Sequence, residues 1–456
     1  MKPNDRIELN ITATAQDGRG IARTNGLVVF VHGTLEGERV IAQIYTVHKT
    51  YATAGAVEIL KTSPYREKNF CDAAENCGGC PLAHITYEKQ LEIKKQTVVD
   101  ALARLGKFDL SDVEVLETKG MENPFRYRNK MVFPLETKNK KTVGGFYERR
   151  SHNVVPLKGC DAGEKAASVA LNTVVNFLNR EGISAYDEKA KKGSFRRVFV
   201  RTAYHTKELM IVLSSATEQI KNLNALTEML RDTDFGGYTL KSIILNINKK
   251  PNNLVLGEKN ITLWGENTIK DTLLGLTFTI SPHSFFQVNP VQTEVLYKTA
   301  LDFADIDNTK TVLDIYCGIG TISLCAAKNA KEVVGVEIVE KAISDAKENA
   351  RKNSIKNAEF YCGAAETIVP SLIDTKGFSP DVVIIDPPRK GSDEKTLGAI
   401  LKANPKKIVY VSCNPATLAR DARFLADGGY NLQKIVPVDM FPHTEHVESV
   451  ALLCKE

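Results

Sequence analysis

The sequence has no apolar run long enough to cross a membrane. Its longest apolar stretches, such as residues 27–31 and 382–385, have the length of a β-strand, whereas a membrane-spanning helix needs about 20 apolar residues. The first ten residues are polar and do not have the pattern of an export signal. We therefore expect a cytoplasmic protein with no membrane partner.

The sequence also lacks the cysteine pattern of a disulfide-stabilised secreted domain. Nine cysteines are an odd number, and disulfides are rare in a reducing compartment. Internal repeats and low-complexity tracts are absent, and 43% hydrophobic with 25% charged residues excludes a wholly disordered chain. A chain of 456 residues is long enough for about two to four domains, and we expect a monomer.

Positive charges exceed negative charges only slightly, and the net charge is +5. This small excess does not by itself indicate a polyanionic partner. The basic residues are clustered, however. Residues 126–150 contain eight Lys or Arg against two Glu, and residues 187–201 contain six against two acids. Two such runs in one middle segment favour a nucleic-acid-binding surface over an ordinary solvated face.

The first 61 residues have the pattern of a small β-barrel. Five runs rich in Val, Ile and Thr predict strands at 7–13, 20–24, 27–31, 38–47 and 53–60, with turn residues between them. Five such strands are typical of an OB-like barrel, a fold that often binds oligonucleotides. Another small antiparallel module is the alternative.

Two further regions follow the barrel. Residues 62–283 mix strands with helices at 87–105 and 165–181, which predicts a mixed α+β central domain. From residue 284 to 456, apolar strands alternate with amphipathic helices. This alternation is typical of an α/β fold with a doubly wound, Rossmann-like sheet, and two final strands predict an antiparallel hairpin at its end.

A Gly-rich turn follows the first strand of this third region, where Asp314 to Thr321 reads DIYCGIGT. Glycines there let the backbone approach a ligand, and Glu337 at the end of the next strand can accept the hydroxyls of a ribose. A dinucleotide is disfavoured, because Ser323 replaces the third glycine of that fingerprint and Asp314 would repel a pyrophosphate. The pattern resembles the S-adenosylmethionine site of class I methyltransferases.

The segment Asp386-Pro387-Pro388-Arg389 follows the fourth strand. Two prolines fix the backbone just beyond a strand end. Methyltransferases that act on bases often place an acid-Pro-Pro segment there, beside cofactor and base, so we predict that Asp386 belongs to the site.

Cys413 is the candidate nucleophile, since it ends the fifth strand and precedes a helix. We expect the helix dipole to lower the pKa of this thiol. A thiolate that adds to C6 of uracil makes C5 nucleophilic, and a base must later remove the C5 proton. Spacing does not rank the candidate bases His443, Glu445, His446 and Glu448.

Four cysteines are candidate metal ligands: Cys71, Cys77 and Cys80 lie close together, and Cys160 follows far downstream. This arrangement can hold a [4Fe–4S] cluster or a tetrahedral zinc ion. The spacing favours the cluster, with zinc and a metal-free loop as the alternatives.

Basic and aromatic residues alternate from Phe125 to Lys130, in the order FRYRNK, and again at 145–150. Guanidinium groups bind phosphate, and aromatic rings stack on unpaired bases. We predict RNA contacts at Arg126, Arg128, Asn129 and Lys130.

Four segments together resemble the RNA uracil-5-methyltransferase family: Ser-Phe-Phe-Gln-Val-Asn at 284–289, Asp-Pro-Pro-Arg at 386–389, Ser-Cys-Asn-Pro at 412–415 and Phe-Pro-His-Thr-x-His-Val-Glu at 441–448. Within this family the chain is similar to the bacterial RumA/RlmCD-type enzymes of 23S ribosomal RNA, whose N-terminal barrel is a TRAM domain.

The resemblance implies roles for particular residues. Cys413 would be the nucleophile and Glu448 the base, and Asp386 would lie near both the cofactor and the target base. The four cysteines would hold an iron–sulfur cluster with a structural role. The S-adenosylmethionine site would be formed by Gln287, Tyr316, Thr321, Glu337 and Asp386, although Thr321 stands where some relatives have Asn.

Other functions remain as alternatives. Transfer RNA is an alternative substrate. An RNA cytosine-5-methyltransferase is disfavoured, because such enzymes usually carry a second Cys where this chain has Asp386-Pro387-Pro388. A non-catalytic RNA-binding factor would not need both Cys413 and Glu448, and an iron–sulfur redox enzyme is disfavoured by the missing dinucleotide fingerprint.

Overall fold

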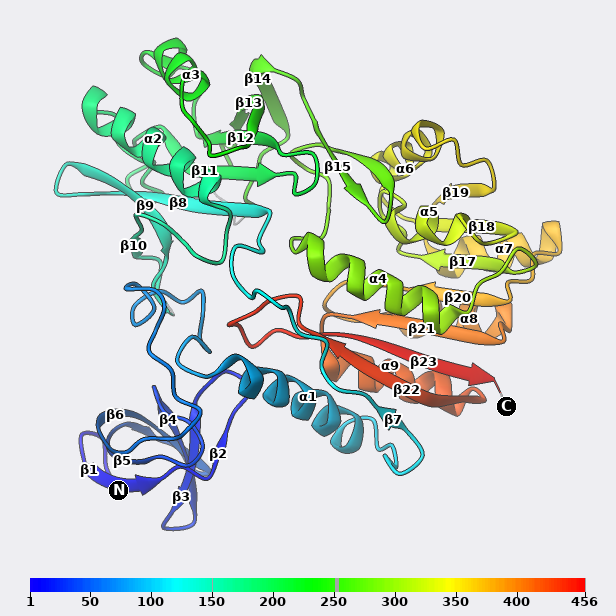
Figure 1. Ribbon diagram of the computed structural model, residues 1–456, viewed down its shortest axis with the longest axis horizontal. Helices are drawn as coiled ribbons and strands as arrows, with labels where there is room; N and C mark the ends of the chain where they lie inside the picture. Colours follow the sequence, from blue (N-terminus) through cyan, green and yellow to red (C-terminus); the bar gives the residue numbers. More distant parts are fainter. Residues whose placement is uncertain (150, 251–253, 456) are drawn as a thin grey trace.

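The computed structural model describes residues 1–149, 151–250 and 254–455 (Figure 1). The strands form sheets of six, seven, two and eight members within these ranges. None of the helices in these ranges combines the length and the apolar character that a membrane span requires.

The N-terminal sheet has six strands, one more than predicted, because the run at 7–13 divides into two strands. The backbone N–H of Ile11 bonds to Glu38 and that of Thr12 bonds to Ile21, so the chain changes its pairing partner at this point. The sheet order is β1-β5-β6-β4-β3-β2. The strands are β1 (Arg6–Asn10), β2 (Ala13–Thr14), β3 (Gly20–Thr24), β4 (Leu27–His32), β5 (Arg39–Val47) and β6 (Tyr51–Lys61).

The central sheet has seven strands in the order β10-β9-β8-β11-β12-β13-β14, and two helices cover one of its faces. The helix predicted at 165–181 is present, and it ends at Gly182, whose φ of 66° is easily adopted by glycine. The elements are β8 (Lys130–Lys138), β9 (Lys141–Tyr147), β10 (Val154–Pro156), α2 (Lys165–Glu181), β11 (Phe195–Thr202), β12 (Glu208–Ser215), α3 (Leu223–Arg231), β13 (Thr239–Ile247) and β14 (Lys259–Gly265).

The basic run at 187–201 is not wholly a surface feature. Arg196 and Arg201 are buried, because they lie on β11 in the middle of the central sheet. The prediction of an exposed basic face is therefore wrong for these two residues. Arg150, in the other basic run, lies outside the described residues.

The C-terminal sheet has eight strands in the order β19-β18-β17-β20-β21-β23-β22-β7. Its β17 to β21 are parallel. All of them except the edge strand β19 are largely buried, which explains their nearly continuous apolar runs. The predicted final hairpin is β22 and β23, with β23 antiparallel to both β21 and β22. The strands are β7 (Glu114–Val115), β17 (Thr311–Ile315), β18 (Glu332–Glu337), β19 (Ala358–Cys362), β20 (Val382–Ile385), β21 (Lys407–Ser412), β22 (Tyr430–Val438) and β23 (Glu448–Lys455).

Helices cover both faces of this sheet. One face carries α4 (Pro290–Ala304), α5 (Thr321–Ala327), α6 (Glu340–Lys352) and the hairpin of β15 (Ile269–Leu273) and β16 (Leu276–Ile280). The other face carries α1 (Tyr87–Arg104), α7 (Ala365–Lys376), α8 (Glu394–Ala403) and α9 (Pro415–Asp427). Apolar residues of the central sheet join the first of these two cores, which ties the central and C-terminal parts together.

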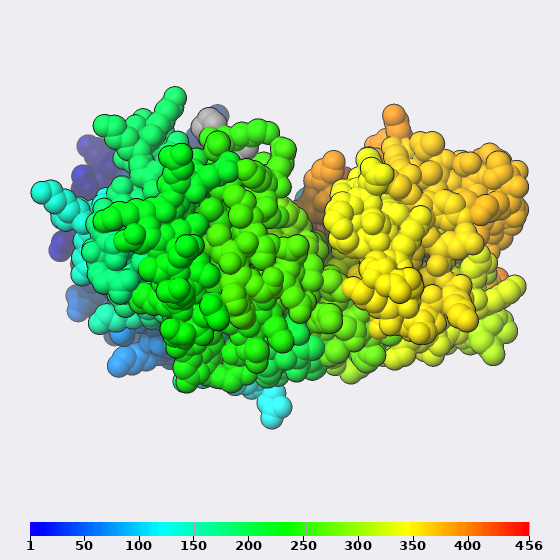
Figure 2. All heavy atoms as spheres, turned by 90° about the horizontal axis from the view of Figure 1, so that it is seen from above, coloured from blue at the N-terminus to red at the C-terminus, as the bar shows by residue number. Residues whose placement is uncertain are grey.

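Two elements that precede the predicted domain boundary at residue 283 pack with the C-terminal sheet. Helix α1 packs on the C-terminal sheet through Val98 and Leu102, and β7 pairs in parallel with β22 at the sheet edge. Seen from above, the surface is hollowed where the green central residues meet the yellow and orange C-terminal residues (Figure 2).

Candidate active site

A pocket of about 860 Å³ opens at the carboxyl ends of the parallel strands, between the central and C-terminal parts. This is the usual ligand position on an open α/β sheet. The pocket gathers nine of the predicted site residues, namely Arg128, Lys130, Gln287, Tyr316, Thr321, Glu337, Asp386, Cys413 and Glu448.

The turn after β17 forms one wall of the pocket. Tyr316 has a φ of +67°, which non-glycine residues seldom adopt, and its N–H bonds to the Val336 carbonyl at 2.9 Å. Glu337 is oriented by backbone donors, since Oε2 accepts from Gly318 N at 3.3 Å and Oε1 from Val339 N at 2.9 Å. Each oxygen keeps a lone pair, so this carboxylate can also accept ribose hydroxyls.

Two further carboxyl groups lie in the same pocket, beneath and beside the turn. Asp314 accepts a hydrogen bond from the Ser323 hydroxyl, and its burial raises its pKa to about 7. Burial likewise raises the pKa of Asp386 to about 7. A positive charge in the pocket would favour the ionised form of both groups, so the site suits a cationic ligand such as a sulfonium.

Strand register brings the predicted nucleophile and the predicted base together. Ser412 of β21 is paired with Ser449 of β23. Because these strands are antiparallel, the residue after Ser412 and the residue before Ser449 lie across from one another, and these are Cys413 and Glu448. Asn414 fixes the following helix, because its side chain accepts from Ala416 N at 3.1 Å.

The thiol of Cys413 does not have the lowered pKa expected from its place before a helix. Burial raises it to about 11, and the charges of Glu448 and Asp386 act in the same direction, while Arg389 lowers it. The expectation is wrong because burial of the thiol, together with the nearby carboxyl groups of Glu448 and Asp386, outweighs any effect of the helix terminus. Burial and Asp386 also raise the pKa of Glu448, to about 8.

Of the four candidate bases, only Glu448 lines this pocket. His443 is buried elsewhere: its ring is stacked on Phe125 at 4.9 Å, and its backbone N–H donates to Gln90 Oε1 at 2.9 Å. Glu445 and His446 lie at a different surface, near the loop between β2 and β3. The structure therefore separates candidates that spacing alone left equal.

Three aromatic residues of the pocket were not predicted as site residues. Tyr297 on α4 is buried, and its hydroxyl lies 3.0 Å from Thr321 Oγ1. Phe285 is 67% exposed at the rim, and Phe441 also lines the pocket. Phe285 and Phe441 lie in the segments that carry the family resemblance, whereas nothing in the sequence marks Tyr297.

The predicted RNA-contacting residues differ in how accessible their side chains are. Arg126 is exposed, and Arg128 and Lys130 line the pocket. Asn129 is only 5% exposed, and its Nδ2 donates to the Gln287 carbonyl at 3.0 Å. Its side chain thus joins two segments of the protein, and an RNA contact by Asn129 stays a prediction.

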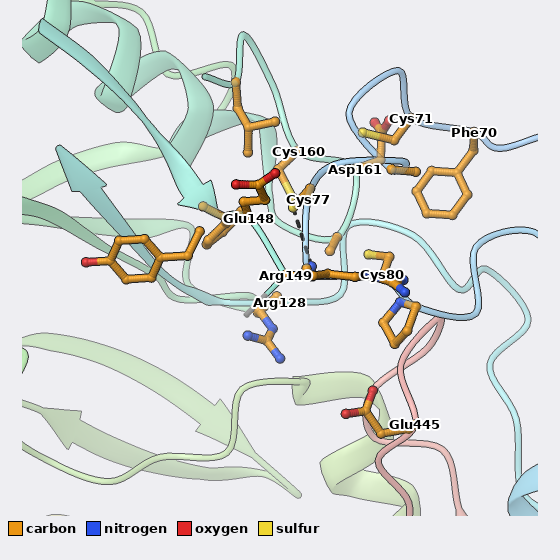
Figure 3. Close-up of a pocket in the computed structure, with 18 of the residues that line it drawn as sticks. Phe70, Cys71, Cys77, Cys80, Arg128, Glu148, Arg149, Cys160, Asp161 and Glu445 are labelled. Atoms are coloured by element: carbon orange, nitrogen blue, oxygen red, sulfur yellow. Dashed lines mark hydrogen bonds between the residues drawn. The ribbon is translucent and has the colours of Figure 1, made fainter. Parts of the chain in front are cut away.

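The four cysteines line a second pocket, of about 600 Å³ (Figure 3). Burial raises the pKa of Cys80 to about 12, and the neighbouring thiolates add to this shift. Gly79 N donates to Cys77 Sγ at 3.4 Å. In the described ranges, no group of three or more His, Cys, Asp or Glu side chains is arranged to hold a metal ion. The structure shows only that the four thiols line one pocket.

Comparisons with known proteins agree with this geometry. A model of the tRNA (Uracil-5-)-methyltransferase family matches residues 86–456, and a TRAM domain model matches residues 2–57. An RNA methyltransferase from Caldanaerobacter subterraneus subsp. tengcongensis is 45% identical and covers 99% of each chain. One from Listeria monocytogenes serovar 1/2a is also 45% identical, over 99% of this chain and 98% of its own.

A solved structure shares the architecture of the whole chain. It is the tRNA (uracil-54, C5)-methyltransferase of Pyrococcus abyssi in complex with S-adenosyl-L-homocysteine, with a TM-score of 0.76 and 27% identity over 98% of this chain and 100% of that one. These similarities do not favour a cytosine methyltransferase or a non-catalytic binding factor. The chain belongs to the tRNA (uracil-5-)-methyltransferase family, whose members use S-adenosylmethionine to methylate C5 of uracil in RNA, and it carries an N-terminal TRAM domain.

Proposed function

We propose that this enzyme transfers the methyl group of S-adenosylmethionine to C5 of a uridine in 23S ribosomal RNA. The observation that carries the chemistry is the pairing of Ser412 with Ser449, since it brings a thiol and a carboxyl group together in one pocket. The choice of ribosomal RNA is supported by the resemblance of four sequence segments to the bacterial enzymes of that RNA.

The reaction needs a nucleophile and a base, and Cys413 and Glu448 supply them. The Cys413 thiolate adds to C6 of uracil, and the electron pair of the C5–C6 double bond moves onto the C4 carbonyl. C5 attacks the methyl carbon, whose bond to the sulfonium sulfur breaks. Glu448 then takes the C5 proton, the double bond re-forms, and the C6–Sγ bond breaks. No oxidant or reductant is consumed.

Both groups must first lose a proton. With pKa values raised to about 11 and about 8, Cys413 and Glu448 are mostly protonated in the free enzyme at neutral pH. Arg389 already favours the thiolate, and the positive charge of a bound sulfonium near Asp386 acts in the same direction. The methyl donor therefore also helps to ionise the nucleophile.

The remaining predicted residues bind the two substrates. Glu337 would accept the ribose hydroxyls of the methyl donor, and Asp386 would lie near both the donor and the target base. Gln287, Tyr316 and Thr321 complete the donor site. On the RNA side, Arg126 offers an exposed charge on the surface, and Arg128 and Lys130 lie inside the pocket.

Transfer RNA is the second candidate substrate. The observation that favours it is the similarity to the tRNA (uracil-54, C5)-methyltransferase of Pyrococcus abyssi. The target base must be unpaired or flipped from its stack in either RNA, because the thiol and the methyl donor approach it from different sides.

The four-cysteine pocket is proposed to hold a [4Fe–4S] cluster on Cys71, Cys77, Cys80 and Cys160. The support is that all four thiols line one cavity, and four cysteine thiolates are the usual ligands of a [4Fe–4S] cluster. The cluster would be structural, since methyl transfer needs no electron. Iron and sulfide analysis of anaerobically purified protein tests this, and stoichiometric zinc without iron would contradict it.

We place the enzyme in the cytoplasm, as a monomer. A reducing compartment is required because the proposed chemistry needs Cys413 as a free thiol. Sedimentation of the purified protein tests the monomer, and a stable dimer would contradict it.

The product identifies the substrate. Purified enzyme is incubated with labelled S-adenosylmethionine and with ribosomal or transfer RNA from cells lacking this gene, and the nucleosides are separated by mass spectrometry. We expect 5-methyluridine in 23S RNA, and none with Cys413→Ala. Label in transfer RNA alone would support the second candidate, whereas 5-methylcytidine would overturn the proposed base.

A further inference from the structure

Three cationic side chains gather where the central sheet meets the active-site pocket. Lys130 of β8 is the direct cross-strand partner of Arg201 on β11, and Arg128 lies two residues before Lys130. Like charges directly opposite one another destabilise a sheet. The close approach of these three positive charges is therefore unfavourable in the free protein, and a bound anionic ligand would offset it.

In the part of the chain that the structure describes, none of these three side chains is within ion-pair distance of a carboxylate, and the charges that act on Lys130 are those of Arg201 and Arg128. Arg201 is 4% exposed, and its Nη2 donates to the Ser284 carbonyl, while its Nε has no partner. The Nε of Arg128 is likewise buried without a partner. Burial lowers the pKa of Lys130 to about 8, and the charges of Arg201 and Arg128 add to this effect.

Two of the three cationic side chains line the active-site pocket. Arg128 and Lys130 both line the pocket that contains Cys413, and the guanidinium of Arg128 lies 5.8 Å from the centre of the Phe441 ring. At the edge of the cysteine pocket, Arg128 is drawn with its guanidinium turned away from the cysteines (Figure 3). The pocket is thus lined by cationic side chains, Arg128 and Lys130 with Arg389 and Lys390, as well as by the carboxyl groups of Asp314, Asp386 and Glu448.

The backbone that carries the three cationic residues is also firmly held. Asn129 lies between Arg128 and Lys130, and it bonds to the Gln287 and Val288 carbonyls at 3.0 and 2.8 Å. Together with the bond from Arg201 to Ser284, these contacts hold the cationic residues against segment 284–289. A ligand group bound here would be placed at a fixed distance from the rest of the pocket.

We propose that Arg128 and Lys130, with Arg201 behind them, bind one backbone phosphate of the RNA next to the target uridine. The proposal rests on the proposed function. A phosphate supplies the missing negative charge and several acceptor oxygens, which match a guanidinium fork and an ammonium group. Phosphate contacts position a nucleic acid while its base is read or modified elsewhere, so this contact would hold the uridine in register with the thiol.

The test compares Lys130→Met with Lys141→Met, which removes an exposed charge at the start of β9 outside the pocket. Binding of ribosomal RNA from cells lacking this gene is measured over a KCl series, and binding of S-adenosylmethionine is measured separately. We expect Lys130→Met to weaken RNA binding about tenfold and to reduce the salt slope by about 0.7, the value for one single-strand phosphate. Lys130→Arg should retain both, and S-adenosylmethionine affinity should stay within about twofold, which also shows that the variant is folded.

Two results would overturn the proposal. One is an RNA affinity and salt slope that change no more than in Lys141→Met. The other is lost S-adenosylmethionine affinity with unchanged RNA affinity, which would assign the cluster to the donor's own carboxylate. Arg128→Gln provides the same comparison if Lys130→Met does not fold. Methyl transfer is measured on the same RNA, so failure of the proposed function shows as absent methylation despite intact, Lys130-dependent binding.

Discussion

Cys413 and Glu448 lie across from one another at the ends of two antiparallel strands, because Ser412 of β21 is paired with Ser449 of β23. Helix α9 and strand β22 lie between the two residues in the chain. A one-residue slip of this register would turn one of the two side chains to the opposite face. The proposed chemistry therefore depends on this pairing.

Replacing the thiol should abolish methyl transfer without loss of binding. Cys413→Ala removes the group that adds to C6, so kcat should fall by more than about 1,000-fold. The affinities for S-adenosylmethionine and RNA should be retained, because neither depends on the thiol. Cys362→Ala is the matched control, since Cys362 is exposed and outside the pocket. Measurable turnover by Cys413→Ala would contradict the covalent route.

The rate should rise with pH through the ionisation of the base. Glu448 acts only when ionised, and its pKa is raised to about 8 by burial and by Asp386. Below that pH the carboxyl group is protonated, so kcat/KM should increase as pH passes from about 7 to about 9. A profile that is flat or falls over this interval would show that Glu448 is not the limiting base.

The affinity for S-adenosylmethionine should be more dependent on pH than the affinity for S-adenosylhomocysteine. The two ligands differ by one methyl group and by the sulfonium charge. Asp314 and Asp386 have pKa values raised to about 7, so their negative charge, which attracts a sulfonium, is lost as pH falls. Titration calorimetry between about pH 6 and 8 should show weaker S-adenosylmethionine binding at the acid end. Asp386→Asn should reduce the difference in pH dependence between the two ligands. Identical pH dependence of both affinities in the wild-type enzyme would contradict this prediction.

A buried ion pair should stabilise the segment before Glu448. Lys94 Nζ on α1 lies 2.5 Å from Asp439 Oδ1, both side chains are almost fully buried, and the ammonium also donates to the Phe441 carbonyl at 3.0 Å. Lys94→Met leaves the carboxylate unpaired, so the free energy of unfolding should fall by about 3–5 kcal/mol.

Lys89 provides the control for this prediction. It lies on the same helix and pairs with two glutamates that are partly exposed. Exposed ion pairs contribute little, so Lys89→Met should cost less than about 1 kcal/mol in denaturant unfolding. Equal losses for both variants would show that burial of the Lys94 pair has no special effect.

Sequence alone predicts the C-terminal fold well, because parallel strands buried on both faces leave apolar runs that are easy to recognise. It also locates Glu337 and Asp386, since each ends such a strand. It does not predict the raised pKa of Cys413, which depends first on burial of the thiol and then on the carboxyl groups of Glu448 and Asp386. The burial of Asn129 and the place of Tyr297 depend likewise on tertiary contacts that no local pattern encodes.

Helix α1 illustrates the same limit for domain boundaries. Its periodicity predicts a helix at 87–105, and the structure has one at Tyr87–Arg104. Its packing partners, however, include α9 and β22, which are more than about 300 residues away in the chain. A sequence pattern shows that a helix has an apolar face, but not which surface that face will cover.

The most direct test of the proposed chemistry is a denaturing gel of Glu448→Gln after incubation with RNA and methyl-labelled S-adenosylmethionine. Without the base, C5 keeps its proton after methylation and the C6–Sγ bond cannot break. We expect a stable, labelled protein–RNA adduct that is absent from the Cys413→Ala/Glu448→Gln double variant. Release of free methylated RNA by Glu448→Gln at the wild-type rate, or an adduct formed only by Glu445→Gln, would contradict the assignment of Glu448 as the base.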